Sequence, residues 1–254
     1  MRLVGFRRAA LGLPLVLGPA LAAPPALAAD AFSAEQRKAI EAIVRDYLIK
    51  NPEVIIEVIE AAKEKLSSDA QAQRAKTLAE RRQEIFEDPN APVAGNPKGD
   101  VTLVEFFDYR CPYCKQVAPS IEALLGDDKQ LRVVYKEFPV LGPDSVTAAR
   151  AALAARKQGK YEALHQALMG MKGQINEAAI LGAAKSVGID VERLKRDMAA
   201  PEIDQMLKAN HQLAAALDIN GTPGFVIGDE VVPSAVGIDT LRQLIATARS
   251  EKAK

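Results

Sequence analysis

The sequence carries no net charge, because 33 lysine and arginine residues are balanced by 33 aspartate and glutamate residues. Proteins that bind nucleic acid or an anionic membrane surface usually show a clear excess of basic residues. The charge balance therefore predicts no nucleic-acid partner and no electrostatic membrane partner. With 48% apolar and 26% charged residues, the chain has the composition of an ordinary globular protein.

The sequence also lacks an uninterrupted apolar stretch long enough to span a bilayer. Its most apolar segment, residues 9–21, follows three arginines and is broken by two glycines and two prolines. The small-x-small run Ala26-Leu27-Ala28 comes next. This order is typical of a secretory signal peptide, and it fits a membrane anchor poorly because the apolar run is short. We expect residues 1–28 to be a signal peptide cleaved near Ala28 and the mature protein to be periplasmic.

Cysteine is scarce, since Cys111 and Cys114 are the only two. Outside the cytosol a disulfide between them could persist, but it would close a loop too small to stabilise the fold. A zinc site would need two further ligands, and neither His165 nor His211 has a suitable spacing. Each histidine is better interpreted as a helix-surface or packing residue. We therefore expect a chemical role for the two thiols, with no resident metal and no cofactor; transient Cu(I) binding stays open because Cu(I) prefers sulfur ligands.

Residues 29–90 have helical periodicity. The apolar positions between residues 40 and 48 form one helical stripe, and Asn51-Pro52 separates this helix from a second amphipathic helix. A polar helix is expected over residues 69–87, and Pro89 ends it. Short amphipathic helices bury little surface alone, so these must pack on the following domain or on copies of themselves. We favour a homo-oligomer formed through residues 33–66.

Residues 91–254 read as an α/β catalytic domain. Residues 101–107 form a run of apolar β-formers, which predicts a buried strand, and a helix is expected after the cysteines. Residues 131–135 predict a second strand, parallel to the first because a helix connects the two. Helical periodicity then fills an insertion over about residues 143–219, and a hairpin over residues 224–232 precedes a last helix.

The cysteines lie where a strand gives way to a helix. A cysteine directly before a helix faces the free N–H groups and the positive end of the helix dipole, and both favour the reactive thiolate. Pro112 suits the first helical turn because it has no N–H to satisfy. Cys114 lies almost one turn further on, where burial is more common. The spacing predicts that Cys111 is the entry nucleophile and Cys114 the resolving thiol.

The run from Val104 to Lys115, VEFFDYRCPYCK, resembles the active-site segment of the DsbA-like thiol-disulfide oxidoreductases. Thr222-Pro223-Gly224-Phe225 resembles the cis-proline loop of that family. The resemblance extends over about residues 91–250 and implies a thioredoxin-like fold with a helical insertion. The N-terminal helices resemble the extension of the ScsC-type branch (suppressor of copper sensitivity), which can mediate oligomerisation.

The resemblance also implies roles for single residues. Pro223 would follow a cis peptide bond, and the backbone of Thr222 would pair with a substrate strand, with Pro112 and Tyr113 as further substrate contacts. Glu105 would be a buried acid that assists proton transfer at Cys114. The alternative for Glu105 is a solvent-facing strand residue, but the two-residue repeat places it on the same face as two apolar neighbours, which favours burial.

The expected activity is thiol-disulfide exchange on unfolded or misfolded exported proteins that contain cysteines. The Cys-Pro-Tyr-Cys sequence lacks the histidine of strongly oxidising DsbA enzymes, which slightly favours an isomerase or reductase supplied by a membrane reductant. A dedicated dithiol oxidase, which would need a membrane oxidant, is the alternative. A Cu(I)-binding or thiol-protecting periplasmic protein and a helical chaperone scaffold are less favoured.

Overall fold

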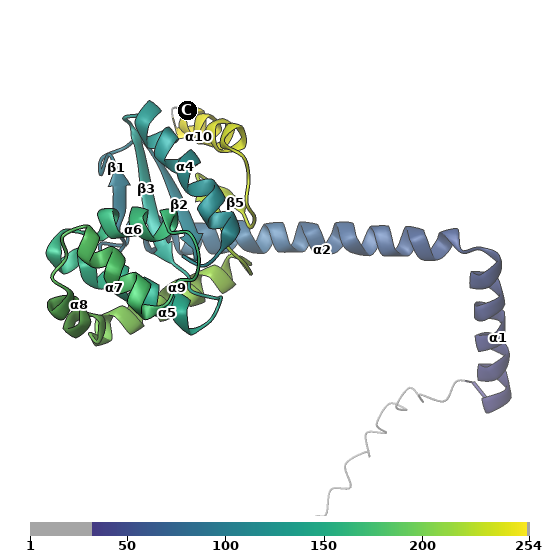
Figure 1. Cartoon of the computed structure of the whole chain (residues 1–254). Helices are drawn as coiled ribbons and strands as arrows, with labels where there is room; N and C mark the ends of the chain where they lie inside the picture. The colour runs from purple at the N-terminus through teal and green to yellow at the C-terminus, as the bar shows by residue number, and fades with distance from the viewer. Residues whose placement is uncertain (1–31, 253–254) are drawn as a thin grey trace, which may run out of the picture. The chain divides into compact units, whose positions relative to one another are not determined.

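The computed structural model describes residues 32–252, and the chain divides into two compact units after Ala61 (Figure 1). The expected signal peptide, residues 1–28, lies outside the described residues. Over residues 32–252, no helix is both long enough and apolar enough to cross a membrane.

The N-terminal unit contains α1 (Ala34–Lys50) and the beginning of α2 (Glu53–Glu80). A capping box starts α1, because the Gln36 N–H donates to Ser33 Oγ at 3.2 Å and the Ser33 N–H donates to Gln36 Oε1 at 2.8 Å. The apolar stripe of these helices faces solvent, with Ile43 at 68% and Val58 at 62% exposure. Self-association through this stripe stays a prediction.

The sequence predicts a separate polar helix over residues 69–87, but the first part of this stretch belongs to α2. α2 runs without a break to Glu80, and only α3 (Arg82–Phe86) follows it. Nothing between Leu66 and Glu80 stops a helix, because the residues there are mostly good helix formers without proline or glycine. Leu78, Ile85 and Phe86 are buried against the sheet, so this stretch is less solvated than its polar composition predicts.

The second unit is built on a five-stranded sheet with the order β1-β3-β2-β4-β5. Its central strands, β2 (Val101–Phe107) and β3 (Leu131–Glu137), are parallel as predicted, and α4 (Pro112–Asp127) connects them. β4 (Gly224–Ile227) and β5 (Glu230–Val232) form the predicted hairpin. The short edge strand β1 (Val93–Gly95) pairs antiparallel with β3 and was not predicted, because three residues are too few for a periodic signal.

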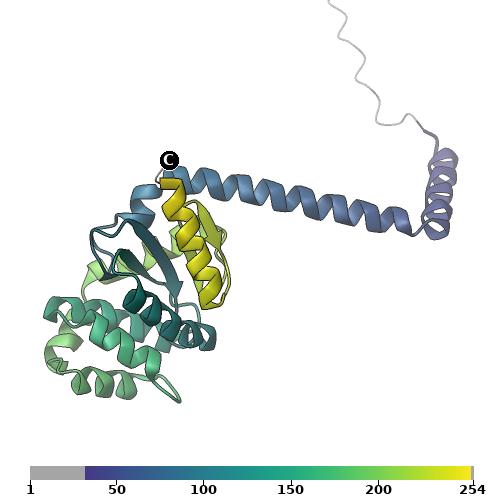
Figure 2. The ribbon, with the colours of Figure 1, turned by 90° about the horizontal axis from the view of Figure 1, so that it is seen from above.

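Helices cover both faces of this sheet. One face packs against α4, α10 (Ile238–Lys252) and the insertion, and α10, in yellow, runs beside the β4–β5 hairpin (Figure 2). The other face packs against α3, the end of α2 and the end of α9. Because both faces are buried, β2 and β3 are apolar almost throughout.

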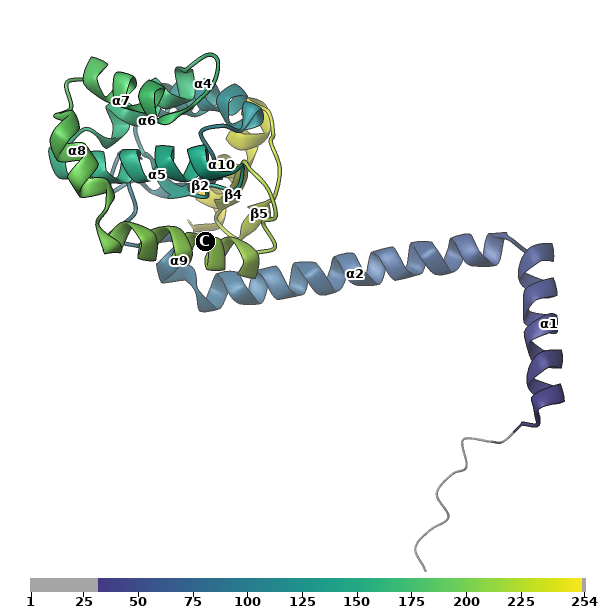
Figure 3. The ribbon, with the colours of Figure 1, turned by 60° about the horizontal axis from the view of Figure 1, so that its bottom comes forward.

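The helical insertion lies between β3 and β4, as expected, and its helices group together at one end of the sheet (Figures 1 and 3). They are α5 (Pro143–Ala155), α6 (Tyr161–Gly170), α7 (Glu177–Ser186), α8 (Val191–Met198) and α9 (Pro201–Ala216), with one 3-10 turn at Arg156–Gln158. The chain therefore has the predicted thioredoxin-like fold with a helical insertion and an N-terminal helical extension.

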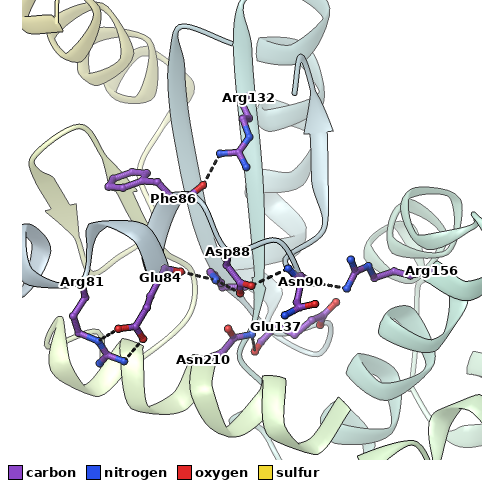
Figure 4. Close-up of polar contacts among 10 residues, drawn as sticks. Arg81, Glu84, Phe86, Asp88, Asn90, Arg132, Glu137, Arg156 and Asn210 are labelled. Carbon is purple, nitrogen blue, oxygen red and sulfur yellow. Dashed lines mark hydrogen bonds and ion pairs between the residues drawn. The ribbon is translucent and has the colours of Figure 1, made fainter. Parts of the chain in front are cut away.

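Three basic side chains of the second unit bind α3 and the segment that follows it up to β1 (Figure 4). Arg132 donates to the carbonyl of Phe86 at 2.5 Å, and Arg156 donates to the carbonyl of Asn90. The buried Lys136 ammonium donates to the Glu84 carbonyl at 3.0 Å and pairs with Asp88 at 2.8 Å. Residues 82–92 are thus an integral part of the second unit.

Candidate active site around Cys111 and Cys114

The two cysteines lie where β2 turns into α4. Cys111 is the N-cap residue of α4, in an extended conformation, and Pro112 is the first helical residue. Both cysteines are free thiols, and both are buried, Cys114 completely. Between them the Tyr113 side chain is 59% exposed. The local sequence dictates this arrangement, since a proline at the first helical position starts the helix directly after Cys111.

The loop before β4 brings Thr222 and Pro223 to Cys111. The Cys111 thiol donates a hydrogen bond to the Thr222 carbonyl oxygen, with 3.2 Å between sulfur and oxygen. The Thr222–Pro223 peptide bond is cis. Cys111 and Thr222, which are 111 positions apart in the chain, therefore meet at the start of α4. The Thr222 carbonyl lies beside the thiol that is predicted to react first.

Cys114 lies in an environment that strongly favours the thiol form. Burial raises the pKa of Cys114 far above its ordinary value, and the negative charge of Glu105 raises it further. Hydrogen bonds from the Asp108 backbone and the Thr222 side chain act in the opposite direction and are weaker. Cys114 therefore needs a proton acceptor before it can act as a nucleophile.

Glu105 is buried, as the two-residue repeat predicts, and not solvent-facing. Its carboxyl is 1% exposed, and its Oε1 atom has no hydrogen-bond partner among the described residues. Burial raises the pKa of Glu105 to about 8. A cavity of about 20 Å³, lined also by Tyr135 and His165, adjoins this carboxyl. That volume is enough for about one water molecule, so the site can accommodate a proton carrier next to Glu105.

Asp108 is a buried carboxylate that sequence reasoning missed. Its Oδ1 atom accepts from the Arg110 N–H at 2.7 Å and from the Ser145 hydroxyl at 2.8 Å. Its Oδ2 atom accepts from the N–H groups of Val140 at 2.8 Å and Leu141 at 3.0 Å. The bond to Arg110 is an Asx turn, which the sequence Asp-x-x-Cys before a helix could have signalled. The bonds to the loop after β3 had no signal in the sequence.

A second buried cluster lies behind the cysteine turn. The hydroxyls of Tyr109 and Tyr161 both donate to Glu137 Oε1 at 2.9 Å. Burial raises the pKa of Glu137 well above its usual range, although the two hydroxyls act against this. His165 Nδ1 lies 3.1 Å from the Tyr109 hydroxyl, and burial lowers the pKa of His165 to about 3. His165 is thus a neutral packing residue, in agreement with the sequence-based interpretation.

Comparison with known proteins gives two family matches. The model described as "DSBA-like thioredoxin domain" matches residues 102–246, more than half of the chain. The model described as "Copper resistance protein ScsC N-terminal domain" matches residues 36–65. Over residues 32–252, no group of three or more histidine, cysteine, aspartate or glutamate side chains is arranged to hold a metal ion.

Solved structures agree with these matches. A thioredoxin-like oxidoreductase from Silicibacter pomeroyi is 52% identical, with a TM-score of 0.66 over 66% of this chain and 98% of that chain. Proteus mirabilis ScsC in a transitional conformation is 33% identical, with a TM-score of 0.64 over 87% of this chain and 98% of that chain. A curated relative, the Na(+)/H(+) antiporter NhaA 1 of Salinispora arenicola, is 29% identical over 61% of this chain. The chain spans about a quarter of the length of the curated relatives it matches, 24% in this case.

Proposed function

The chain belongs to the DsbA-like thioredoxin family of thiol-disulfide oxidoreductases, and we propose that it exchanges disulfides in exported proteins through Cys111 and Cys114, with isomerase or reductase activity favoured over oxidation. The observation that carries this proposal is the contrast between the two thiols. Cys111 lies at the start of α4 against the Thr222 carbonyl, whereas Cys114 is fully buried with a strongly raised pKa.

The reaction begins with the Cys111 thiolate. It attacks one sulfur of a client disulfide, so that a mixed disulfide forms and the other client sulfur leaves as a thiolate. The Cys114 thiolate then attacks the sulfur of Cys111. A Cys111–Cys114 disulfide forms, the second client sulfur leaves, and the client is reduced by two electrons while the enzyme is oxidised. A membrane reductant must then return both electrons.

The second step requires that Cys114 lose its proton. Glu105 is the proposed acceptor, since its raised pKa of about 8 makes the ionised carboxylate a stronger base than an ordinary one, and about half of it is ionised near pH 8. Because burial raises the pKa of Cys114, little of it is thiolate, and this resolution step would be slow. A free client thiol then has time to attack the mixed disulfide, which rearranges the client without net electron transfer. This slow resolution supports isomerase activity.

Client binding is assigned to the surface around Cys111. The exposed side chain of Tyr113 and the ring of Pro112 are proposed to contact the client on the α4 side. On the other side, the Thr222 and Pro223 backbone would pair with an extended client strand. An incoming client N–H would donate a hydrogen bond to the Thr222 carbonyl oxygen in place of the Cys111 thiol. The thiol would then be free to attack.

A homo-oligomer through residues 33–66 would let several active sites hold one client. An open groove of about 910 Å³ between α1 and α2, lined by apolar residues such as Ile40, Val44 and Ile55, supports self-association. The match of residues 36–65 to the ScsC N-terminal domain supports it too. Export to the periplasm is proposed from the signal-peptide pattern of residues 1–28.

The test is the refolding of a scrambled multi-disulfide protein in a mild redox buffer. The mature chain from Ala29 is compared with a chain that starts at Ala62, since residues 62–252 include the docked α3 segment. We expect the full chain alone to restore the activity of the scrambled protein. The shorter chain should still oxidise dithiols. Equal dithiol oxidation by both chains, with no recovery of the scrambled protein by either, would identify a dedicated oxidase. Tight Cu(I) binding without turnover by either chain would instead favour a copper-binding or thiol-protecting protein.

A further inference from the structure

The Asp108 carboxylate has no free acceptor position. An ionised carboxylate offers about four lone-pair sites, and Asp108 receives four donors, two on each oxygen. The side chain is 1% exposed, so these bonds replace the water that burial removes. With two donors on each oxygen, Asp108 has no acceptor position left for a client N–H. Its role must lie in what it holds in place.

The four donors come from both sides of the active site. Arg110 directly precedes Cys111, whereas Val140, Leu141 and Ser145 belong to the loop after β3 and the start of α5. The backbone bond from Phe138 N–H to the Phe107 carbonyl is the last one between the ends of β2 and β3. Beyond it, the Asp108 carboxylate and a bond from the Arg110 guanidinium to the Leu141 carbonyl connect the loop to the cysteine turn.

The held loop presents apolar side chains to solvent. The large apolar side chains that are exposed in residues 62–252 are Leu66, Val93, Tyr113, Val140 and Leu141. Tyr113 lies next to the cysteine turn, and Val140 and Leu141 lie on the loop that Asp108 joins to this turn. Val140 is 40% exposed and Leu141 is 43% exposed. Exposed apolar side chains that gather beside a reactive thiol suit a partner that is itself unfolded and apolar.

We propose that Asp108 is a positioning residue that fixes the Val140–Leu141 loop beside Cys111, and that this loop binds apolar side chains next to the client cysteine; the proposal rests on the proposed exchange activity. Replacement by asparagine is a direct test. An amide nitrogen that faced the loop would oppose the Val140 and Leu141 N–H groups, and one that faced Arg110 would oppose the Arg110 N–H and open the turn that aims the side chain at the loop, so either orientation loosens the loop.

The substrates are two disulfide-linked peptide pairs, one with leucine and one with serine on either side of the cysteine. With Asp108→Asn we expect the KM for the leucine peptide to rise about tenfold while kcat stays within about twofold. The KM for the serine peptide should hardly change. Alkylation of Cys111 by iodoacetamide should also stay within about twofold, because the thiol itself keeps its place at α4.

The matched control is Asp100→Asn. Asp100 accepts from Arg249 at 2.7 and 2.8 Å at the opposite end of β2, so its loss can lower stability without touching the loop. The double variant Val140→Ser and Leu141→Ser keeps Asp108 and should reproduce the KM rise for the leucine peptide, even if Asp108→Asn does not fold.

Two results would overturn the inference. One is an unchanged leucine-peptide KM in either the Asp108→Asn or the double variant. The other is a fall in the alkylation rate by the same factor as kcat/KM, which would mean that Asp108 acts on Cys111 and not on the loop. A wild-type chain that turns over neither peptide would refute the exchange activity itself, so the two failures are distinguishable.

Discussion

Replacement of Glu105 by glutamine should change how the stability of this protein depends on pH. Burial raises the pKa of Glu105 from its ordinary value of 4.5 to about 8. Between these two values the unfolded chain has an ionised carboxylate, while the folded chain keeps the proton. The folded state therefore binds more protons, and its free energy of unfolding falls as the pH rises through this window.

The size of the effect follows from the two pKa values. One pKa unit corresponds to about 1.4 kcal/mol, so Glu105 lowers the free energy of unfolding by about 5 kcal/mol once the pH is above both values. Glutamine has nearly the same shape and does not titrate. The difference in stability between Glu105→Gln and wild type should thus grow by about 3 to 4 kcal/mol from about pH 5 to about pH 8.

The assay is urea unfolding of both proteins at the two pH values, with the thiols kept reduced. The variant-minus-wild-type difference is the quantity to use, because His165 also has a shifted pKa, which burial alone causes, and its contribution cancels in the difference. Glu122→Gln is the matched control, since Glu122 lines the same cavity but is exposed. A difference for Glu105→Gln that is equal at both pH values would refute a buried acid with a raised pKa.

Three further outcomes are expected. In Glu105→Gln, release of a client from its mixed disulfide with Cys111, followed in a single turnover, should slow at least about 100-fold near pH 8; an unchanged rate would remove Glu105 from proton transfer. Lys136→Met leaves Asp88 without its cation and should lower the free energy of unfolding by about 2 to 3 kcal/mol in chemical denaturation, whereas a loss below about 0.5 kcal/mol would mean that α3 docks through apolar contacts alone. Ile43→Glu with Val58→Glu places charges on the apolar stripe and should yield monomers in light scattering; an unaltered oligomer would place the interface elsewhere.

The docked α3 segment affects how the N-terminal helices can be studied. Ile85 and Phe86 pack in the core on one face of the sheet, and Lys136 forms a buried ion pair with Asp88. A chain cut at residue 91 would expose this core face and leave Lys136 buried without its partner. Loss of activity in such a chain would report damage to the second unit, so removal of the helices is better tested from Ala62.

The sequence by itself determined the parts of this protein that depend on local order. The position of Cys111 before a helix follows from Pro112, the burial of Glu105 follows from the apolar residues on both sides of it in β2, and the start of α1 follows from the capping box at Ser33. Each of these features depends on residues within a few positions of one another. The order of the main strands and helices along the chain, and the resemblance to the DsbA family, also follow from short stretches of sequence.

The tertiary structure alone decided what surrounds those elements. Three of the four donors to Asp108 come from residues more than 30 positions away. Glu137 accepts from the hydroxyls of Tyr109 and Tyr161, which lie on two separate segments of the chain. The attachment of α3 through Arg132 and Lys136 is also long-range. A periodic pattern shows which side of an element is buried, but it does not show which distant polar group will meet it there. Such partners are set only when the loops close, because a buried polar atom takes whichever donor or acceptor the packed chain brings within hydrogen-bond distance.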